Sequence, residues 1–236
     1  MRPTSPQMEA FESLKSKIKS VEESSSKWGI AFIGPNGYGK TEVIKNLTEK
    51  MTSDKLKFVR LDLLASAICP EPRVNVNWGE YIKQVKDLLP NIDFSEIDKI
   101  SSDLNKMSKV ASICKENDKR VFIVLDHLEF CKNWREARYP IENEIGDIIA
   151  VCDEDVWNDK KSDRVVTSFF FKRVYLNNPI DLEKDKETFC EIIAEKFKLE
   201  RPAIIEFFEK VSKEYSKGRI YSWNDMLQMI DEMEII

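Results

Sequence analysis

The sequence predicts an α/β protein: a five-stranded parallel sheet with helices on both faces, followed by a small all-helical lid. Two observations predict the sheet. Five short apolar segments, at 27–34, 57–64, 120–126, 147–152 and 172–176, have the length and composition of strands. Amphipathic segments separate them, and strands that alternate with helices form parallel sheets. A third observation predicts the lid, because no strand-like segment follows Pro179.

Helical periodicity marks the segments between and around these strands. In residues 6–22 the apolar positions recur at spacings of three and four, namely Met8, Phe11, Leu14, Ile18 and Val21. Further helices are predicted over 39–51, 78–89, 94–116, 183–198, 202–216 and 222–234. The chain therefore divides into an N-terminal helix and linker (1–24), a sheet domain (25–180) and a helical domain (181–236). The second boundary falls in NNPIDLE, where Asn-Pro favours a turn.

Composition and charge exclude several classes of protein. Hydrophobic residues make up 42% of the 236 residues and charged residues 33%, which is typical of a globular protein. No apolar run approaches the roughly 18 residues needed to cross a bilayer, and MRPTSPQMEAFESLKSK lacks the apolar core of a secretory signal. We expect an intracellular protein, cytoplasmic or nuclear, with no membrane partner. The net charge of −5 predicts that nucleic acid is contacted only indirectly.

Cysteine and histidine usage argues against two further kinds of site. The five cysteines are scattered and form no CxxC pair, which argues against a disulfide framework and against a zinc site. The single histidine nearly excludes a histidine-based metal site.

One glycine-rich stretch carries the strongest chemical signal. GPNGYGKT, from Gly34 to Thr41, matches G-x-x-x-x-G-K-[ST] between a predicted strand and a predicted helix. Its backbone N–H groups can cradle phosphates, Lys40 can reach the β- and γ-phosphates, and Thr41 can ligate Mg²⁺. ATP or ADP with Mg²⁺ is therefore the expected ligand. The predicted nucleotide contacts are Gly34, Pro35, Asn36, Gly37, Tyr38, Gly39, Lys40, Thr41 and Glu42.

An acid at the end of the third predicted strand is the natural second part of this site. In VFIVLD an apolar run leads to Asp126, whose carboxylate would emerge at the carboxyl edge of a parallel sheet beside the phosphate loop. There it can hold Mg²⁺ through water or through the Thr41 hydroxyl, so Thr41 and Asp126 are the predicted metal residues. A solvated acid at a strand end is the alternative interpretation.

The stretch WGIAFIGPNGYGKTEVIKNL resembles the AAA+ ATPases, and the resemblance extends at the level of pattern over roughly residues 25–236. It implies a three-layer αβα P-loop NTPase core, a C-terminal helical lid, and ATP sites at subunit interfaces. It also implies a polar sensor at the end of a strand, which the alignment places at Asp153, and a lid arginine, for which Arg219 is the candidate.

The departures from the family's pattern concern hydrolysis. Where the family usually has Asp-Glu, this chain has Asp126 followed by His127, so the acid that polarises the attacking water is missing. Glu129 is a possible substitute, because it would share a face with His127 on a strand. The sensor is the acid Asp153 instead of Asn or Thr, and Ser168 stands where an arginine finger is usual. Arg164 and Arg173 are nearby candidates for that arginine, although Arg173 is expected to begin a strand. The predicted catalytic residues are Lys40, Asp126, Glu129 and Asp153.

Two classes of function follow. The first is an AAA+-type ATPase, weak or dependent on a partner, that acts with other protein subunits to remodel a macromolecule, as a replication initiator or helicase loader or as a protein remodeller. The second is a nucleotide-gated interaction module that binds ATP and hydrolyses little. The intact phosphate loop favours both, and the substitutions at hydrolysis positions favour low turnover.

Overall fold

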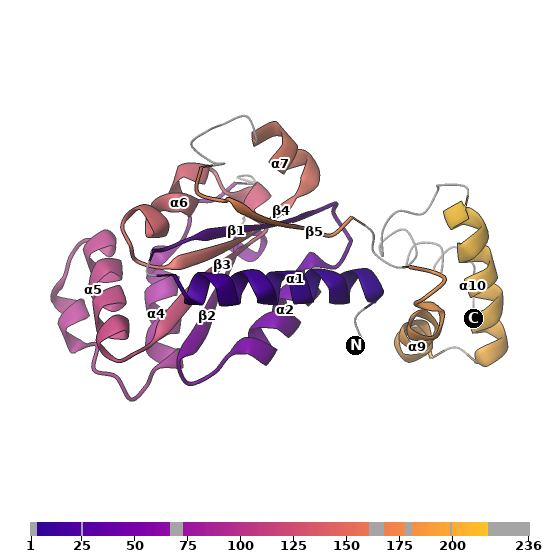
Figure 1. The fold of residues 1–236 in the computed structure, drawn as a ribbon, viewed down its shortest axis with the longest axis horizontal. Helices are drawn as coiled ribbons and strands as arrows, with labels where there is room; N and C mark the ends of the chain where they lie inside the picture. The colour runs from indigo at the N-terminus through magenta and orange to yellow at the C-terminus, as the bar shows by residue number, and fades with distance from the viewer. Residues whose placement is uncertain are drawn as a thin grey trace.

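The computed structural model describes residues 4–24, 26–66, 73–160, 168–177, 181–198 and 200–216. Within them, five strands form one parallel sheet in the order β2-β3-β4-β1-β5 (Figure 1). The strands are β1 (Gly29–Gly34), β2 (Leu56–Asp62), β3 (Arg120–Asp126), β4 (Asp147–Asp153) and β5 (Lys172–Tyr175). The predicted five-stranded parallel sheet is confirmed.

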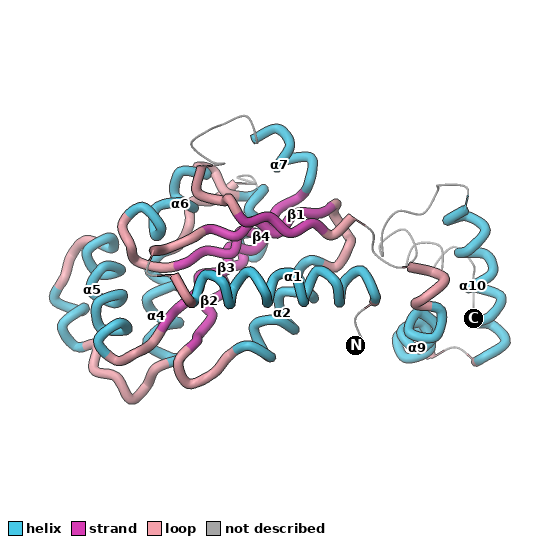
Figure 2. The backbone as a smooth tube through the Cα atoms, in the orientation of Figure 1, coloured by secondary structure: helices cyan, strands magenta, loops and turns pink. Residues whose placement is uncertain are grey.

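Helices cover both faces of this sheet and make three layers (Figure 2). On one face lie α1 (Ser5–Glu22) and α2 (Lys40–Met51). On the other lie α4 (Trp78–Leu88), α5 (Asp103–Glu116), α6 (Trp134–Glu142) and α7 (Glu154–Lys160). The central strands β1, β3 and β4 are almost entirely apolar because both of their faces are buried, as the unbroken apolar run of β3 predicts. The outer strands β2 and β5 also carry charged residues.

The sequence pattern misplaces some elements. The helix predicted over 94–116 is two, the short 3₁₀ helix η1 (Ser95–Lys99) and α5. Ile100 is extended, and the polar residue Ser102 occupies the N-cap of α5, where serine is favoured over the helix interior. The strand predicted over 57–64 ends at Asp62, because Leu63–Ser66 form the single-turn helix α3. Neither α6, which contains Pro140, nor α7 was predicted.

After β5 the described chain is helical. Helices α9 (Lys186–Phe197) and α10 (Arg201–Ser216) pack against each other through stacked Phe189 and Phe207, whose ring centroids lie 5.9 Å apart. They lie beside the sheet, past the N-terminal end of α1 (Figure 1). The third predicted helix, 222–234, falls outside the described residues, and the domain boundaries stay predictions. In the part of the chain that the structure describes, no helix is both long and apolar enough to span a membrane.

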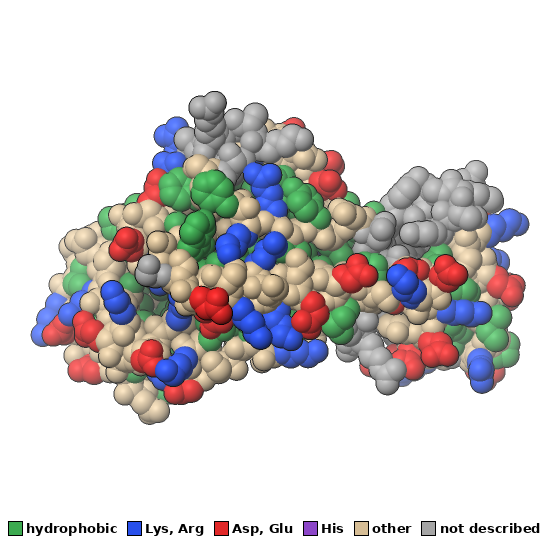
Figure 3. All heavy atoms as spheres, viewed as in Figure 1, with side chains coloured by type: hydrophobic (Ala, Val, Ile, Leu, Met, Phe, Trp, Pro, Cys, Tyr) green, Lys and Arg blue, Asp and Glu red, His purple; other side chains and the backbone are tan. Residues whose placement is uncertain are grey.

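Charged side chains of both signs cover the surface of the α1–α2 layer. Figure 3 shows Lys and Arg interspersed with Asp and Glu on this face. Several of these charges form exposed ion pairs, such as Lys15 with Glu12. Mixed charge of this kind favours solubility more than it favours binding to a polyanion.

Candidate nucleotide site

The loop between β1 and α2 has the backbone geometry that its glycines predict. Gly37 and Gly39 have φ values of 76° and 86°, in the left-handed region that residues with a Cβ rarely adopt. Gly39 is also the N-cap of α2, so the amino end of that helix opens onto the loop. Gly34 is tightly packed, because a Cβ there would lie 2.6 Å from the carbonyl oxygen of Leu176. The loop therefore has the backbone shape that a phosphate-binding loop requires.

Lys40 begins α2 and turns back over the loop. Its Nζ donates to the carbonyl oxygens of Gly34, at 2.7 Å, and Pro35, at 2.9 Å. It also forms an ion pair of 2.7 Å with Oδ1 of Asp153. Only 8% of Lys40 is exposed. Its ammonium thus lies where phosphates would meet the loop, but an acid of the protein already partners it.

Asp153 reaches Lys40 because of the sheet topology. It is the last residue of β4, which lies beside β1, and it stands in register with Gly34. The alignment placed the sensor at this position, and the structure puts its carboxylate directly at the phosphate loop. A phosphate that binds Lys40 must therefore compete with this carboxylate.

Thr41 and Asp126 meet as predicted for the metal residues. The Thr41 hydroxyl lies 3.2 Å from Oδ2 of Asp126, which ends β3 and is fully buried. The backbone N–H of His127 donates to Oδ1 of Asp126, at 3.1 Å. The alternative of a solvated strand-end acid is wrong, since Asp126 has no exposed surface.

Arg60, which the sequence analysis did not single out, also binds Asp126. It lies on β2, next to β3, and its Nε and Nη2 donate to Oδ2 of Asp126 at 2.9 and 2.6 Å. Nη2 also donates to Asp62, at 3.1 Å. The sequence could have indicated this contact. An arginine near the end of the strand segment KFVRLD needs either an acidic partner or access to solvent.

His127 and Glu129 form a pair of their own. His127 has a φ of 59°, and residues 128–130 form the 3₁₀ helix η2 (Leu128–Phe130), so the expectation that both share a strand face is wrong. The turn nevertheless brings Nδ1 of His127 to 3.0 Å from Oε1 of Glu129. Oε2 of Glu129 also accepts the N–H of Asp153, at 3.4 Å.

The titration of this pair follows from its geometry. The hydrogen bond to Glu129 raises the pKa of His127, against the effect of burial. Burial raises the pKa of Glu129, but the hydrogen bond and charge of His127 outweigh it, so the carboxyl pKa is lowered overall. Each group stabilises the charged form of the other. Neither is a free base at the site.

Comparisons with known proteins bear on the fold. No family model matches the chain, and no curated protein matches it in sequence. Among solved structures it is similar to the ORC2 protein of Aeropyrum pernix in ADPNP–ADP complexes, with a TM-score of 0.59 and 11% identity, covering 95% of this chain and 67% of that one. The chain has the fold of the AAA+ proteins.

Two further AAA+ structures are similar at the same level. For the A. pernix ORC1 protein in complex with DNA the TM-score is 0.53 and the identity 13%, over 97% of this chain and 65% of that one. For Saccharomyces cerevisiae Hsp104 in complex with casein the TM-score is 0.56 and the identity 13%, over 98% of this chain and 37% of that one. The chain thus spans about two thirds of the ORC chains and a smaller share of Hsp104.

The other AAA+ positions are placed as follows. Ser168, at the position usual for the arginine finger, is exposed, and Arg173 lies on the edge strand β5 with its guanidinium over the ring of Trp157. Glu42 lies in the first turn of α2. Arg219 falls outside the described residues, so its role as the lid arginine stays a prediction.

The site's oxygen donors fit the Mg²⁺ that the AAA+ fold implies. Mg²⁺ prefers oxygen ligands and keeps several of its waters, so a threonine hydroxyl and one carboxylate suffice to hold it beside a nucleotide. Thr41 and Asp126 provide that pair. In the described part of the chain no group of three or more His, Cys, Asp and Glu forms a separate metal centre.

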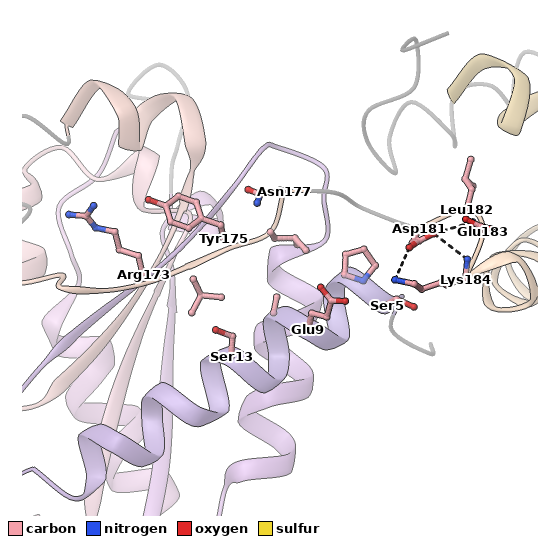
Figure 4. A pocket seen from close by; sticks show the side chains of 14 residues that line it. Ser5, Glu9, Ser13, Arg173, Tyr175, Asn177, Asp181, Leu182, Glu183 and Lys184 are labelled. Carbon is pink, nitrogen blue, oxygen red and sulfur yellow. Dashed lines mark hydrogen bonds and ion pairs between the residues drawn. The ribbon is translucent and has the colours of Figure 1, made fainter. Parts of the chain in front are cut away.

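The first turn of α1 joins the phosphate loop to the helical segment. The buried Gln7 side chain donates to the carbonyl oxygen of Tyr38 in the loop, at 3.4 Å. The N–H and hydroxyl of Ser5 both donate to Oδ1 of Asp185, at 2.7 Å, just before α9. Beside these contacts a pocket of about 750 Å³ opens between α1, β5 and residues 181–184 (Figure 4). Sequence reasoning missed this connection.

Proposed function

We propose that this chain is an AAA+-type ATP-binding protein whose Mg²⁺-dependent hydrolysis is weak or depends on a partner. The phosphate loop carries the proposal, since Lys40, Thr41 and Asp126 meet at its mouth. A loop of left-handed glycines before a helix N-terminus, with a buried lysine and a Thr–Asp pair, suits a nucleotide polyphosphate. The proposed ligand is ATP or ADP.

Low intrinsic turnover is supported by how the acids of the site are used. Hydrolysis needs a base or polarising group for water and positive charge on the γ-phosphate. Glu129 is tied to His127, and Asp153 is tied to Lys40. Ser168 brings no positive charge. A second subunit that contributes an arginine would provide the missing charge. An arginine finger of this kind raises the rate of hydrolysis by about 10³- to 10⁵-fold.

The proposed context is an assembly with other protein subunits that remodels a macromolecule. The similar structures include an ORC protein with DNA and Hsp104 with casein, so both replication-initiator and protein-remodeller roles suit the fold. The net charge of −5 and the mixed charge over α1 and α2 favour nucleic acid contact through partners.

A nucleotide-gated interaction module is the second candidate. The Gln7–Tyr38 and Ser5–Asp185 contacts favour it, because they connect the phosphate loop to the helical segment through one turn of α1. Nucleotide that reshapes the loop would then reposition α9 without any hydrolysis.

Two measurements on one sample test the proposal and separate the candidates. We expect the pure chain to bind ATP and to release little phosphate at any protein concentration. Binding of ATP should raise its melting temperature. Phosphate release that rises with added partner subunits would select the ATPase. Tight binding with no release under any condition would select the module, and the absence of any nucleotide binding would refute both.

Asp153→Asn should raise ATP affinity. The variant keeps the shape of the side chain but frees Lys40 from an ion pair of 2.7 Å and removes negative charge beside the γ-phosphate. A charge-assisted hydrogen bond is worth roughly 1.5–3 kcal/mol, so an affinity gain of about tenfold is expected by titration calorimetry. Asp155→Asn, an exposed acid on α7, is the matched control and should change nothing. Equal affinities of Asp153→Asn and the natural chain would contradict this account of the sensor.

A further inference from the structure

The ion pair between Arg60 and Asp126 places a protein cation on the carboxylate expected to serve Mg²⁺. Oδ2 of Asp126 accepts from Nε and Nη2 of Arg60, and the Thr41 hydroxyl lies 3.2 Å away. Oδ1 accepts the N–H of His127. Asp126 is completely buried and the Arg60 side chain is 28% exposed, so water screens these contacts only in part. The carboxylate is thus already neutralised before any metal arrives.

The strand register explains why this arrangement is specific to Arg60. Asp62 and Asp126 are neighbours at the carboxyl ends of β2 and β3. Arg60 lies two residues earlier on β2, hence on the same face as Asp62, and its guanidinium contacts both acids. Without that guanidinium, two adjacent carboxylates and the Thr41 hydroxyl would face one another, which is a set of oxygens that suits a divalent cation.

We propose that Arg60 competes with Mg²⁺ for Asp126, so that this chain binds ATP with little help from the metal. This rests on the proposed ATP site. A guanidinium and a divalent cation on the same buried carboxylate repel each other at short range, and the guanidinium is fixed by two hydrogen bonds to Oδ2. Metal occupies the site only when Arg60 releases Asp126. Arg60 is therefore a positioning residue that sets how strongly nucleotide binding depends on Mg²⁺.

The test is the ratio of ATP affinities with Mg²⁺ and with EDTA, measured by fluorescent-nucleotide titration on the full chain. For the natural chain the ratio should be close to one. For Arg60→Gln the ratio should rise about tenfold or more in favour of Mg²⁺. In that variant Mg²⁺ can take the place of the guanidinium at Asp126, and one charge-assisted contact is worth a change of about that size. Adding Asp126→Asn to Arg60→Gln should cancel the gain.

Arg120→Gln is the matched control. Arg120 also donates to a fully buried acid on the neighbouring strand, Asp147, but at the opposite end of the sheet from the phosphate loop. It should leave the ratio unchanged even where it lowers the melting temperature. If Arg60→Gln does not fold, Arg60→Lys keeps the charge but loses the planar fork, and its ratio should lie between one and tenfold.

Three results would overturn the inference: a natural chain that already needs Mg²⁺ for ATP binding, an Arg60→Gln ratio equal to that of the natural chain, or the same rise in Arg120→Gln. If neither Mg²⁺ nor EDTA conditions give ATP binding, the proposed nucleotide site itself fails, and this inference fails with it. The two failures are distinct, because in the first set ATP is still bound.

Discussion

Lys40→Ala is expected to lower ATP affinity by at least about 100-fold while the chain stays folded. The lysine would contact two phosphates, and each charge-assisted hydrogen bond is worth roughly 1.5–3 kcal/mol. In the absence of nucleotide its partners are two loop carbonyls and Asp153, whose side chain is partly exposed and regains water when the lysine is removed. Titration calorimetry with ATP and far-ultraviolet circular dichroism measure the two halves of this expectation.

Lys45→Ala is the matched control for charge and helix. Lys45 lies on the same helix, α2, and its side chain is exposed on the surface. Its loss should leave ATP affinity unchanged. An unaltered affinity in Lys40→Ala would remove the phosphate-loop interpretation altogether, whereas a loss in both variants would indicate a long-range effect of charge.

Asp147→Ala is expected to give the largest loss of stability. Asp147 begins β4 and is completely buried at the end of the sheet opposite the phosphate loop. It accepts from the N–H of Trp28, at 2.9 Å, and from Nε of Arg120, at 2.8 Å, with Lys27 at 3.8 Å. Removing one partner of a buried ion pair costs about 3–5 kcal/mol. For a chain of this size that corresponds to a fall in melting temperature of roughly 6–20 °C.

Asp54→Ala provides the comparison with an exposed pair. Asp54 is 91% exposed and pairs with Lys119, so solvent screens the pair and its removal should change the melting temperature little. Thermal unfolding followed by circular dichroism distinguishes the two variants. Equal and small changes in both would show that the Asp147 cluster contributes no more than a surface pair does.

Much of the fold was predictable because hydrophobic patterning is local. The three central strands are nearly unbroken apolar runs, and α1 repeats its apolar residues every three or four positions. The phosphate loop was predictable for a related reason, since its glycines, lysine and threonine are adjacent in sequence. The boundary between η1 and α5 was missed because only the polar N-cap residue Ser102 marks it, so the apolar periodicity predicted one helix instead of two.

The partners within the site were not predictable, because they depend on strand register and on turns. Asp153 meets Lys40 only because β4 lies beside β1, and Arg60 meets Asp126 only because β2 lies beside β3. Glu129 reaches His127 through a left-handed turn that the sequence does not predict, since positive φ is uncommon for residues other than glycine. Two of these three pairs join residues more than 60 positions apart in the sequence, so no local pattern could indicate which residues meet.

The strand order also bears on how the chain folds as it is synthesised. β1 is synthesised before the other four strands of this sheet, but it pairs with β4, which begins at Asp147, and with β5, which begins at Lys172. Both backbone edges of β1 therefore stay unpaired until most of the chain has been made, although α1 and α2 can already cover one of its faces. Non-local pairing of this kind slows folding and leaves intermediates prone to aggregation. We expect nascent chains that stop before β4 to require chaperones, although they already contain the whole phosphate-loop motif.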